Sequence, residues 1–449
     1  MNLIWIVADT LRADYLGCYG HPWVGTPHLD ELASQGVLLE NLYVEGLPTI
    51  PERIVFFTGT YTLPFRGWQP LWKHDVTLTE VLKQQGYTTA FITDVPHYFR
   101  PGMNFHRGFD SWQLIRGQEF DTYITDPGKG RDPEEFLKAG WRDIPRERRH
   151  LRLKDPRVML GRYLRNVADR ECEDDYFTAQ VLQRSIDWIQ GNHMQQPFFL
   201  WIDCFDPHEP WDPPEHYYLK YAPPGYDGPW LIAPWLVSVA ADDFTEGEIA
   251  HMKALYAGEI TFLDTWIGRL LDVVWDLGLA EDTIILFTSD HGTQFGEHGT
   301  ISKTGILRHT NYRDKVRVPG IVHHPEAQKG RRIEQLIWTP DLMPTLLTLL
   351  GIELPETVHG VPHPWIVSEG EGKGREVVIS GHYARGHWRA TDGTWSYVAG
   401  DEPELYGLEA DPGEQRNIIA QYPEQAQRLQ AAMDAFNERA KELYPASQA

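Results

Sequence analysis

The 449-residue sequence has little of what marks secreted or membrane-bound proteins. It contains only three cysteines, Cys18, Cys172 and Cys204, and none of them forms a CxxC pair. We therefore expect no disulfide framework, which suits a reducing compartment. The apolar stretch at residues 3–8 is too short for a signal segment or a membrane span and has no basic region before it. A cytoplasmic location is the resulting expectation.

Basic residues are also scarce, because 41 Lys and Arg stand against 64 Asp and Glu, giving a formal net charge of −23. Nucleic acids and anionic membrane surfaces are bound by basic faces, so we expect neither as a partner. A small anionic substrate would need a local positive pocket in this field. The composition is that of a globular protein without repeats, and homo-oligomerisation stays open.

Apolar runs alternate with helical patterns along the chain. The apolar runs are residues 2–8, 88–93, 197–202 and 283–288, and the helical patterns cover residues 28–35, 77–85, 175–190 and 245–277. Strands that alternate with helices predict an α/β fold with a doubly wound sheet. Short strand-like pieces and a final helix at 423–443 predict a small C-terminal α+β subdomain. We therefore expect a catalytic domain at residues 1–352 and the subdomain at residues 353–449.

Two segments interrupt this alternation. Residues 115–170 are charged, contain Pro and Gly and show no clear period, so we interpret them as an insertion or a lid. Residues 211–235 are rich in Pro, Trp and Tyr. They form either an aromatic rim over a pocket or an ordered surface loop with buried aromatic rings, and the composition favours neither.

Acidic and imidazole side chains follow two of the predicted strands directly. Asp9 comes after the first apolar run, and Asp290 and His291 come after the last. Open α/β sheets place ligands at the carboxyl ends of their strands. Carboxylate oxygens and imidazole nitrogens are ligands of catalytic divalent ions, so these residues are metal candidates. The alternative for an isolated Asp-His pair is a helix cap beside a surface histidine.

A series of short motifs makes the argument more specific. Val-Ala-Asp-Thr-Leu-Arg ends at Arg12, and Thr-Ile-Pro-Glu-Arg at residues 49–53 is followed by Phe-Thr-Gly-Thr-Tyr. Asp-Pro-His-Glu-Pro at 206–210, Ser-Asp-His-Gly at 289–292 and Glu-Leu-Tyr-Gly-Leu at 404–408 come later. In this order the motifs resemble those of the sulfatase family, within the alkaline phosphatase superfamily. The resemblance covers about the whole chain apart from the two interrupting segments.

The resemblance implies a metal site. Its ligands would be Asp9, Thr49, Asp290 and His291, which together would bind one divalent ion, with Thr49 as the nucleophile. His291 replaces an asparagine that is common in calcium sulfatases, which favours Mn²⁺ or Zn²⁺ while Ca²⁺ remains an alternative. A second ion at Asp206 and His298, as in two-metal branches of the superfamily, stays open.

The resemblance also implies three further catalytic residues. Arg53 would orient the nucleophile and screen charge on the substrate; its alternative is a structural salt bridge. Lys303, twelve residues after His291, would donate to an oxygen of the transferring group. His208 would be the general acid for the leaving group.

Two more residues are candidates for substrate binding. Thr10 takes the place of the usual second acid in the family's Asp-Asp opening, so an oxygen ligand is lost or replaced by a hydroxyl. His97 lies roughly where the family has a Lys-x-x-His pair, although the lysine is missing. An ordinary loop histidine is the alternative for His97.

Thr49 stands where the family has a cysteine, or in some bacterial members a serine, that is oxidised to formylglycine. Threonine carries a methyl group on that carbon, so oxidation cannot give the aldehyde whose re-formation expels sulfate. A phospho-threonine can instead be hydrolysed by water. A threonine in this position also resembles the threonine nucleophiles of the superfamily's phosphodiesterase, phosphonoacetate hydrolase and phosphoethanolamine transferase branches.

We therefore expect a metal-dependent hydrolase of small anionic phosphate or phosphonate esters that uses Thr49. The second interpretation is a sulfate-ester hydrolase that works without formylglycine. The third is a non-catalytic or transferase descendant that binds an anionic ligand. Because Asp9, Arg53, Asp290, His291 and Lys303 are all present, an enzyme is favoured over the third interpretation.

Overall fold

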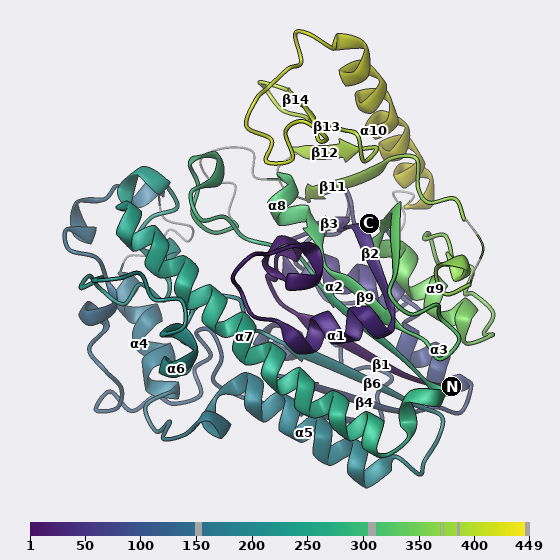
Figure 1. Cartoon of the computed structure of the whole chain (residues 1–449), viewed down its shortest axis with the longest axis horizontal. Coiled ribbons are helices and arrows are strands. Elements are labelled where there is room, and N and C mark those ends of the chain that lie inside the picture. Colours follow the sequence, from purple (N-terminus) through teal and green to yellow (C-terminus); the bar gives the residue numbers. More distant parts are fainter. Residues whose placement is uncertain (149–154, 304–310, 369, 371, 384–386, 445–449) are drawn as a thin grey trace.

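The computed structural model describes residues 1–148, 155–303, 311–368, 370, 372–383 and 387–444. Its centre is a mixed sheet (Figure 1). The strand order in this sheet is β10-β2-β9-β7-β1-β6-β4-β5, and β8 pairs with β2. Five neighbouring strands are parallel: β7 (Thr283–Ser289), β1 (Asn2–Ala8), β6 (Phe198–Cys204), β4 (Thr88–Thr93) and β5 (Ser111–Leu114). The carboxyl ends of these strands therefore meet at one edge of the sheet, and the predicted fold class is confirmed.

The side chains of strand β1 show that both faces of the main sheet are buried. Its residues alternate between two hydrophobic cores, with Ile4 and Ile6 in one and Trp5 and Val7 in the other. The first core packs under α1 (Pro27–Gln35), α5 (Phe177–Asn192) and α7 (Glu246–Asp276). The second lies under α2 (Thr49–Thr58), α3 (Leu78–Gln84) and α9 (Leu342–Leu349). A strand buried on both sides needs a continuous apolar run, which is the pattern in the sequence.

Capping residues mark the first turns of two of the predicted helices. Thr77 and Thr245 accept hydrogen bonds from the backbone of Glu80 and Glu248 and start α3 and α7 as capping boxes. The strands beyond β7 in the strand order were not predicted from the sequence. They are β2 (Val37–Tyr43), β8 (Arg317–Val318), β9 (Gly320–His323) and β10 (Arg331–Trp338). Strands β8 and β9 run antiparallel to β2, so the sheet is mixed rather than wholly parallel.

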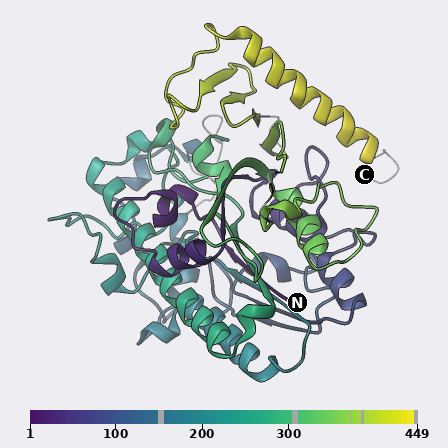
Figure 2. The same ribbon diagram turned by 45° about the vertical axis from the view of Figure 1, so that its right-hand side comes forward.

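The C-terminal part forms a second sheet in the order β14-β13-β12-β11-β3, which confirms the small α+β subdomain. Its own strands are β11 (Val378–His382), β12 (Trp388–Thr391), β13 (Trp395–Val398) and β14 (Glu404–Gly407), and α10 (Pro423–Leu443) packs along it (Figure 2). The fifth strand, β3 (Gly46–Leu47), comes from the N-terminal region and pairs with β11. The two sheets are therefore joined just before Thr49, while a domain boundary at residue 353 stays a prediction.

The two interrupting segments both contribute to the core. Helix α4 (Pro156–Asn166) and short 3₁₀ turns occupy the described part of residues 115–170, and Trp141 and Tyr163 are buried there. In residues 211–235, Trp211 and Trp235 are buried against the same core. The aromatic-rich segment is therefore an ordered loop with buried rings, which was the second of its two interpretations.

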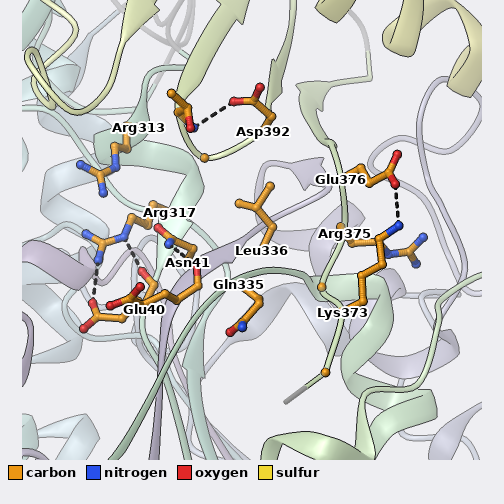
Figure 3. A pocket seen from close by; sticks show the side chains of 15 residues that line it. Glu40, Asn41, Arg313, Arg317, Gln335, Leu336, Lys373, Arg375, Glu376 and Asp392 are labelled. Carbon is orange, nitrogen blue, oxygen red and sulfur yellow. Dashed lines mark hydrogen bonds and ion pairs between the residues drawn. The ribbon is translucent and has the colours of Figure 1, made fainter.

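A large polar cavity of about 880 Å³ lies between the main sheet and the C-terminal sheet (Figure 3). Arg317 and Glu40 pair on one of its walls, and Lys373 pairs with Glu376 on another. The cavity is on the β2 and β10 side of the sheet, whereas β4 and β5 form the opposite side. It thus lies away from the strand ends that carry the predicted site.

All three cysteines are free, as predicted. Across the described residues no helix combines the length and apolar character needed to cross a membrane.

Candidate active site

The predicted metal ligands meet at the carboxyl edge of the main sheet. Strands β1 and β7 are neighbours in which Ala8 lies opposite Ser289, so Asp9 and Asp290 emerge side by side. The ligand atoms of Asp9, Asp290 and His291 lie within 4.8 Å of one another, and all three side chains are fully buried. Within the described part of the chain, this is the one group of three or more acidic, histidine or cysteine side chains with metal-binding geometry.

His291 presents a free ring nitrogen to this cluster. Its Nδ1 is 3.1 Å from the carbonyl oxygen of Gly292, to which it donates, so the lone pair stays on Nε2. That Nε2 lies 3.3 Å from Asp290 Oδ2 and 3.5 Å from Thr49 Oγ1. Burial lowers the pKa of His291 to about 3, so the imidazole is neutral at neutral pH. A neutral imidazole facing two oxygens is a suitable metal ligand.

Thr49 is the first residue of α2, a helix that is buried along its whole length. Pro51 fits in the first turn, where a missing backbone N–H costs no helical hydrogen bond, and Gly59 ends the helix at φ 63°. The hydroxyl of Thr49 therefore lies at the positive end of the helix dipole, beside His291. Thr49 as the nucleophile stays a prediction from the motif, and the helix that carries it was not predicted.

Arg53 lies one turn further along α2 and is fully buried. Its guanidinium is 2.8 Å from Asp203 and 3.3 Å from Asp9, and it also pairs with Asp290. Its Nε donates to the hydroxyl of Tyr98 at 2.9 Å. The hydrogen bonds and ion pairs of Arg53 thus go to carboxylates and to Tyr98 rather than to Thr49, so any effect of Arg53 on Thr49 is indirect.

The negative charge around Arg53 exceeds its own positive charge. Burial and the neighbouring Asp290 raise the pKa of Asp9 well above its usual range. Although Asp290 is also buried, Arg53 and His291 hold its pKa below the usual value. Among the described residues, Asp290 Oδ2 accepts no hydrogen bond and has Arg53 as its counter-ion. Two carboxylates and an imidazole with surplus negative charge fit a divalent cation.

Lys303 and Thr10 extend the site on the open side of Asp9. The Nζ of Lys303 is 3.0 Å from Thr10 Oγ1 and 3.2 Å from Glu209 Oε2. Thr10 donates its hydroxyl to Asp9 at 2.7 Å and its backbone N–H to Asp290 at 2.9 Å. It does so at φ 65°, which is unfavourable for a β-branched residue. Such a conformation is kept where the surrounding contacts require it, as they do here.

The two other histidines predicted for the site, His208 and His97, lie near Lys303 and are both buried. His208 Nδ1 donates to the carbonyl of Glu209 at 2.5 Å, which leaves Nε2 available. His97 Nε2 is 3.4 Å from a carboxylate oxygen of Glu119. Burial lowers the pKa of each imidazole well below its usual value, and the positive charge of Lys303 lowers both further. Each histidine is therefore neutral in the absence of an anionic ligand.

The structure does not bring the second-metal candidates together. Asp206 accepts hydrogen bonds from Thr178 and Gln118, whereas the ring of His298 stacks on Tyr312 at 3.4 Å. These partners belong to different parts of the fold. The described residues thus give no support to a second ion at Asp206 and His298.

Sequence reasoning missed three residues that complete the site. Asp203 and Tyr98 hold Arg53, and Glu209 holds Lys303. Asp203 ends an apolar run and Glu209 follows His208 directly, so both carried a position signal. Tyr98 carried none, because a tyrosine after a strand is ordinary.

Comparisons with known proteins identify the family of the chain. Residues 1–352 match the family model described as Sulfatase, and residues 296–441 match the model described as N-sulphoglucosamine sulphohydrolase, C-terminal. The first match spans well over half of the chain. The chain belongs to the sulfatase family. As a hydrolase of this superfamily, it acts on phosphoric or sulfuric esters.

The sulfatase-family relatives include proteins named for different chemistries. The chain is 27% identical to an arylsulfatase of Clostridium perfringens, over 93% of this chain and 90% of that protein. It is 26% identical to PehA of Trinickia caryophylli, a multifunctional alkaline phosphatase superfamily protein, over 80% and 75% of the two chains. The phosphonate monoester hydrolase of Agrobacterium radiobacter has the same fold, with a TM-score of 0.75, 23% identity and coverage of 98% and 95%. Proteins named for sulfur and for phosphorus esters are thus similar to this chain to a comparable degree.

Proposed function

We propose that this protein hydrolyses phosphate or phosphonate esters with Thr49 as the nucleophile. One observation carries the proposal: a threonine, which cannot be converted to formylglycine, starts α2 with its hydroxyl 3.5 Å from His291 Nε2. The hydroxyl is buried beside the three predicted metal ligands. A residue in this position is suited to attack and unsuited to the aldehyde chemistry of the family.

Asp9, Asp290 and His291 would hold one divalent ion, with the Thr49 oxygen as a further ligand. The ion would supply a lower pKa for the Thr49 hydroxyl and positive charge for the substrate oxygens. Imidazole in the donor set favours Mn²⁺ or Zn²⁺ over Ca²⁺. Arg53 already offsets part of the carboxylate charge, and it fixes the orientation of Asp9 and Asp290 through its ion pairs.

The side chains of the site then divide the reaction between them. Lys303 donates to a non-bridging oxygen of the substrate, whose anionic charge replaces Glu209 as its partner. Thr49 Oγ1, whose proton passes to solvent, forms a bond to phosphorus while the bond from phosphorus to the leaving oxygen breaks. His208, which takes up a proton from solvent when the anion binds, gives that proton from Nε2 to the leaving oxygen. Water then hydrolyses the phospho-threonine and restores the Thr49 hydroxyl.

A sulfate-ester hydrolase that uses unmodified threonine is the second candidate. It is favoured by the likeness to the arylsulfatase, which extends over 93% of this chain. Its difficulty is the release of sulfate. A sulfated threonine has no second hydroxyl on the carbon that carries the sulfate, so it cannot expel sulfate by forming an aldehyde. Phosphorus in the same position is open to attack by water, so the first candidate needs no additional device.

Substitutions at Thr49 test the proposal. Thr49→Ala removes the nucleophile and is expected to abolish turnover, whereas Thr49→Ser keeps the hydroxyl and should retain measurable activity. Thr345→Ala is the matched control and should retain normal turnover, because this buried threonine of α9 donates its hydroxyl to the backbone carbonyl of Asp341. Near-normal turnover of Thr49→Ala with a phosphorus ester would exclude Thr49 as the nucleophile.

Thr49→Cys offers the converse test. With Pro51 and Arg53 in place, the substitution completes the C-x-P-x-R motif for conversion to formylglycine. Co-expressed with a formylglycine-generating enzyme, this variant is expected to gain aryl sulfatase activity when the pocket accepts sulfate. Mass spectrometry of the peptide that contains residue 49 shows whether the conversion took place.

A further inference from the structure

A separate cavity of about 360 Å³ opens at the carboxyl ends of β4 and β5. Its walls come from residues within 96–101 and 114–122 and from Arg162 of α4. Strands β1, β6, β4 and β5 are successive parallel neighbours, so the cavity is at the same sheet edge as Asp9. With neighbouring strands about 4.8 Å apart, it lies about 10–15 Å from the metal ligands.

Three arginines line this cavity, and they differ in their acidic neighbours. Arg116 is neutralised by Asp121, at 2.5 and 2.7 Å. Burial raises the pKa of Glu119 to about 7, and the charge of Arg100 opposes this rise, so Arg100 has Glu119 as an acidic neighbour. Among the described residues no carboxylate lies within ion-pair distance of Arg162, which donates to the sulfur of Met159 at 3.8 Å. The cavity lining thus has three arginines against two acids in a chain with 64 acidic and 41 basic residues, and this local positive surplus favours an anionic ligand.

The wall of the cavity is a fixed structure. Asn166, the last residue of α4, donates to the carbonyls of Gly117 and Asp121 at 2.8 and 2.7 Å and accepts from the N–H of Ile124 at 2.9 Å. Glu119, on the same loop, has φ 55°, in the left-handed region that non-glycine residues rarely adopt. The hydrogen bonds of Asn166 hold the loop that carries Glu119 against α4.

Glu119 connects the cavity with the catalytic centre. It lines the cavity and places a carboxylate oxygen 3.4 Å from His97 Nε2. The ring of His97 lies 6.0 Å from that of Phe205, and Phe205 packs against His208 at 4.0 Å. The cavity is thus on the His208 side of the site, the side that the proposed function assigns to the leaving group.

We infer that this cavity binds the leaving-group end of the substrate and holds a second anionic group on Arg100 and Arg162. The substrate class is an ester whose alcohol portion carries a remote carboxylate, phosphate or sulfate. The inference rests on the proposed function, in which His208 marks the leaving-group side. Guanidinium groups bind all three anions through paired hydrogen bonds, so the charge and its distance from the ester are the selected features.

Two biphenyl-4-yl phosphates test the inference, one plain and one with a carboxylate at the 4′ position, two rings from the ester oxygen. For the wild-type protein, we expect the carboxylated ester to have a KM about tenfold lower, the effect of one or two charge-assisted hydrogen bonds. Arg100→Gln with Arg162→Gln should bring the ratio of the two KM values close to one. Arg184→Gln, in an exposed arginine of α5 that pairs with Asp187, is the control and should keep the preference.

Equal KM values for the two esters in the wild type, or an undiminished preference in the double variant, would overturn the inference. The matched biphenyl-4-yl sulfates should show the same ratio of KM values between the plain and the carboxylated ester. Faster cleavage of the sulfates would therefore contradict the phosphorus specificity but not the anion-binding cavity. Calorimetry on Thr49→Ala removes turnover from the test. There, 4′-hydroxybiphenyl-4-carboxylate is expected to bind about tenfold more tightly than 4-phenylphenol, and equal affinities would again overturn it.

Discussion

Two fully buried arginines, Arg53 and Arg389, show how differently this fold treats buried charge. Arg389, on β12, pairs with one carboxylate, Glu414, at 2.6 Å. Arg53, on α2, faces three carboxylates at the carboxyl edge of the main sheet, those of Asp9, Asp203 and Asp290. The first arrangement is balanced and the second has a surplus of negative charge.

The difference shows where the fold holds its catalytic chemistry. A balanced buried pair needs nothing more than its two partners, and it fixes the position of the chain around it. A surplus of buried carboxylates is costly unless protons or a cation offset the charge. Beside the balanced Arg389–Glu414 pair, burial raises the pKa of Asp314 to about 7, so a proton offsets the charge of this further acid below that pH. At Arg53 the acids lie beside a neutral imidazole and a hydroxyl, which favours a metal ion.

Metal removal gives the largest expected effect and applies to the Arg53 cluster alone. Chelation should abolish turnover, and Mn²⁺ or Zn²⁺ should restore it better than Ca²⁺. Added Mn²⁺ should also raise the Tm of the metal-free protein, since a ligand that binds only the folded state stabilises it. Differential scanning fluorimetry with Asp290→Asn, in which the rise should be lost, checks the site. A rise of the same size in that variant would place the ion elsewhere.

Breaking the balanced pair should mainly affect stability. Arg389→Met leaves the buried Glu414 without its partner and is expected to lower the free energy of unfolding by about 3–5 kcal/mol. Arg389→Met combined with Glu414→Gln removes both charges and should recover a large part of this loss. Urea unfolding measures the three free energies, and kcat of the folded fraction should stay near normal. A catalytic defect without a stability loss would contradict the structural role of Arg389.

Lys303→Ala and His208→Ala sharpen the comparison from the catalytic side. Their proposed contacts strengthen as charge moves to the leaving group, so each substitution should lower kcat by about 10²-fold. Because Lys303 is only 12% exposed and its partner Glu209 is fully buried, the loss of Lys303 should also lower the free energy of unfolding, by about 1–3 kcal/mol. Steady-state kinetics and urea unfolding on the same preparations separate the two effects. Near-normal turnover in both variants would return these residues to a structural role.

The smallest effect concerns the proton on Asp314. Its pKa of about 7 in the folded state lies above the ordinary 3.8, so its contribution to stability is present at low pH and is lost as pH rises through 7. Asp314→Asn does not titrate. Between pH 5 and pH 8 the free energy of unfolding of the wild type should therefore fall by about 1–2 kcal/mol relative to this variant. The fall is smaller than the full pKa difference would give, because the side chain is part-exposed. Urea unfolding at the two pH values measures it, and parallel pH profiles would contradict the protonated form.

The sequence predicted those parts of the site that follow a strong local pattern. Asp9, Asp290 and His291 come directly after apolar strands, and Thr49 and Lys303 belong to ordered motifs, so their convergence at one sheet edge could be expected. Asp203, Glu209 and Tyr98 are site residues only because separate strand ends bring them to Arg53 and Lys303. That convergence is tertiary, and no local period reports it.

The fold shows the same limit. The long apolar runs and the capped helices were predicted within a few residues, because their periods extend over several turns or strand positions. Strands β8 and β9 have two and four residues, too few for a period to be visible. In residues 211–235, a rim and a buried loop have the same Trp and Tyr content, so only packing could decide between them.

The central claim is that Thr49 attacks phosphorus rather than sulfur. Its most direct test is the metal-reconstituted wild-type protein assayed with p-nitrophenyl sulfate, p-nitrophenyl phosphate and the corresponding aryl phosphodiester and phosphonate ester. Because these substrates share one leaving group, their kcat/KM values compare the transferring group alone. We predict that at least one phosphorus ester is hydrolysed faster than the sulfate. A sulfate ester cleaved faster than every phosphorus ester would contradict this account and favour a sulfatase that works with unmodified threonine.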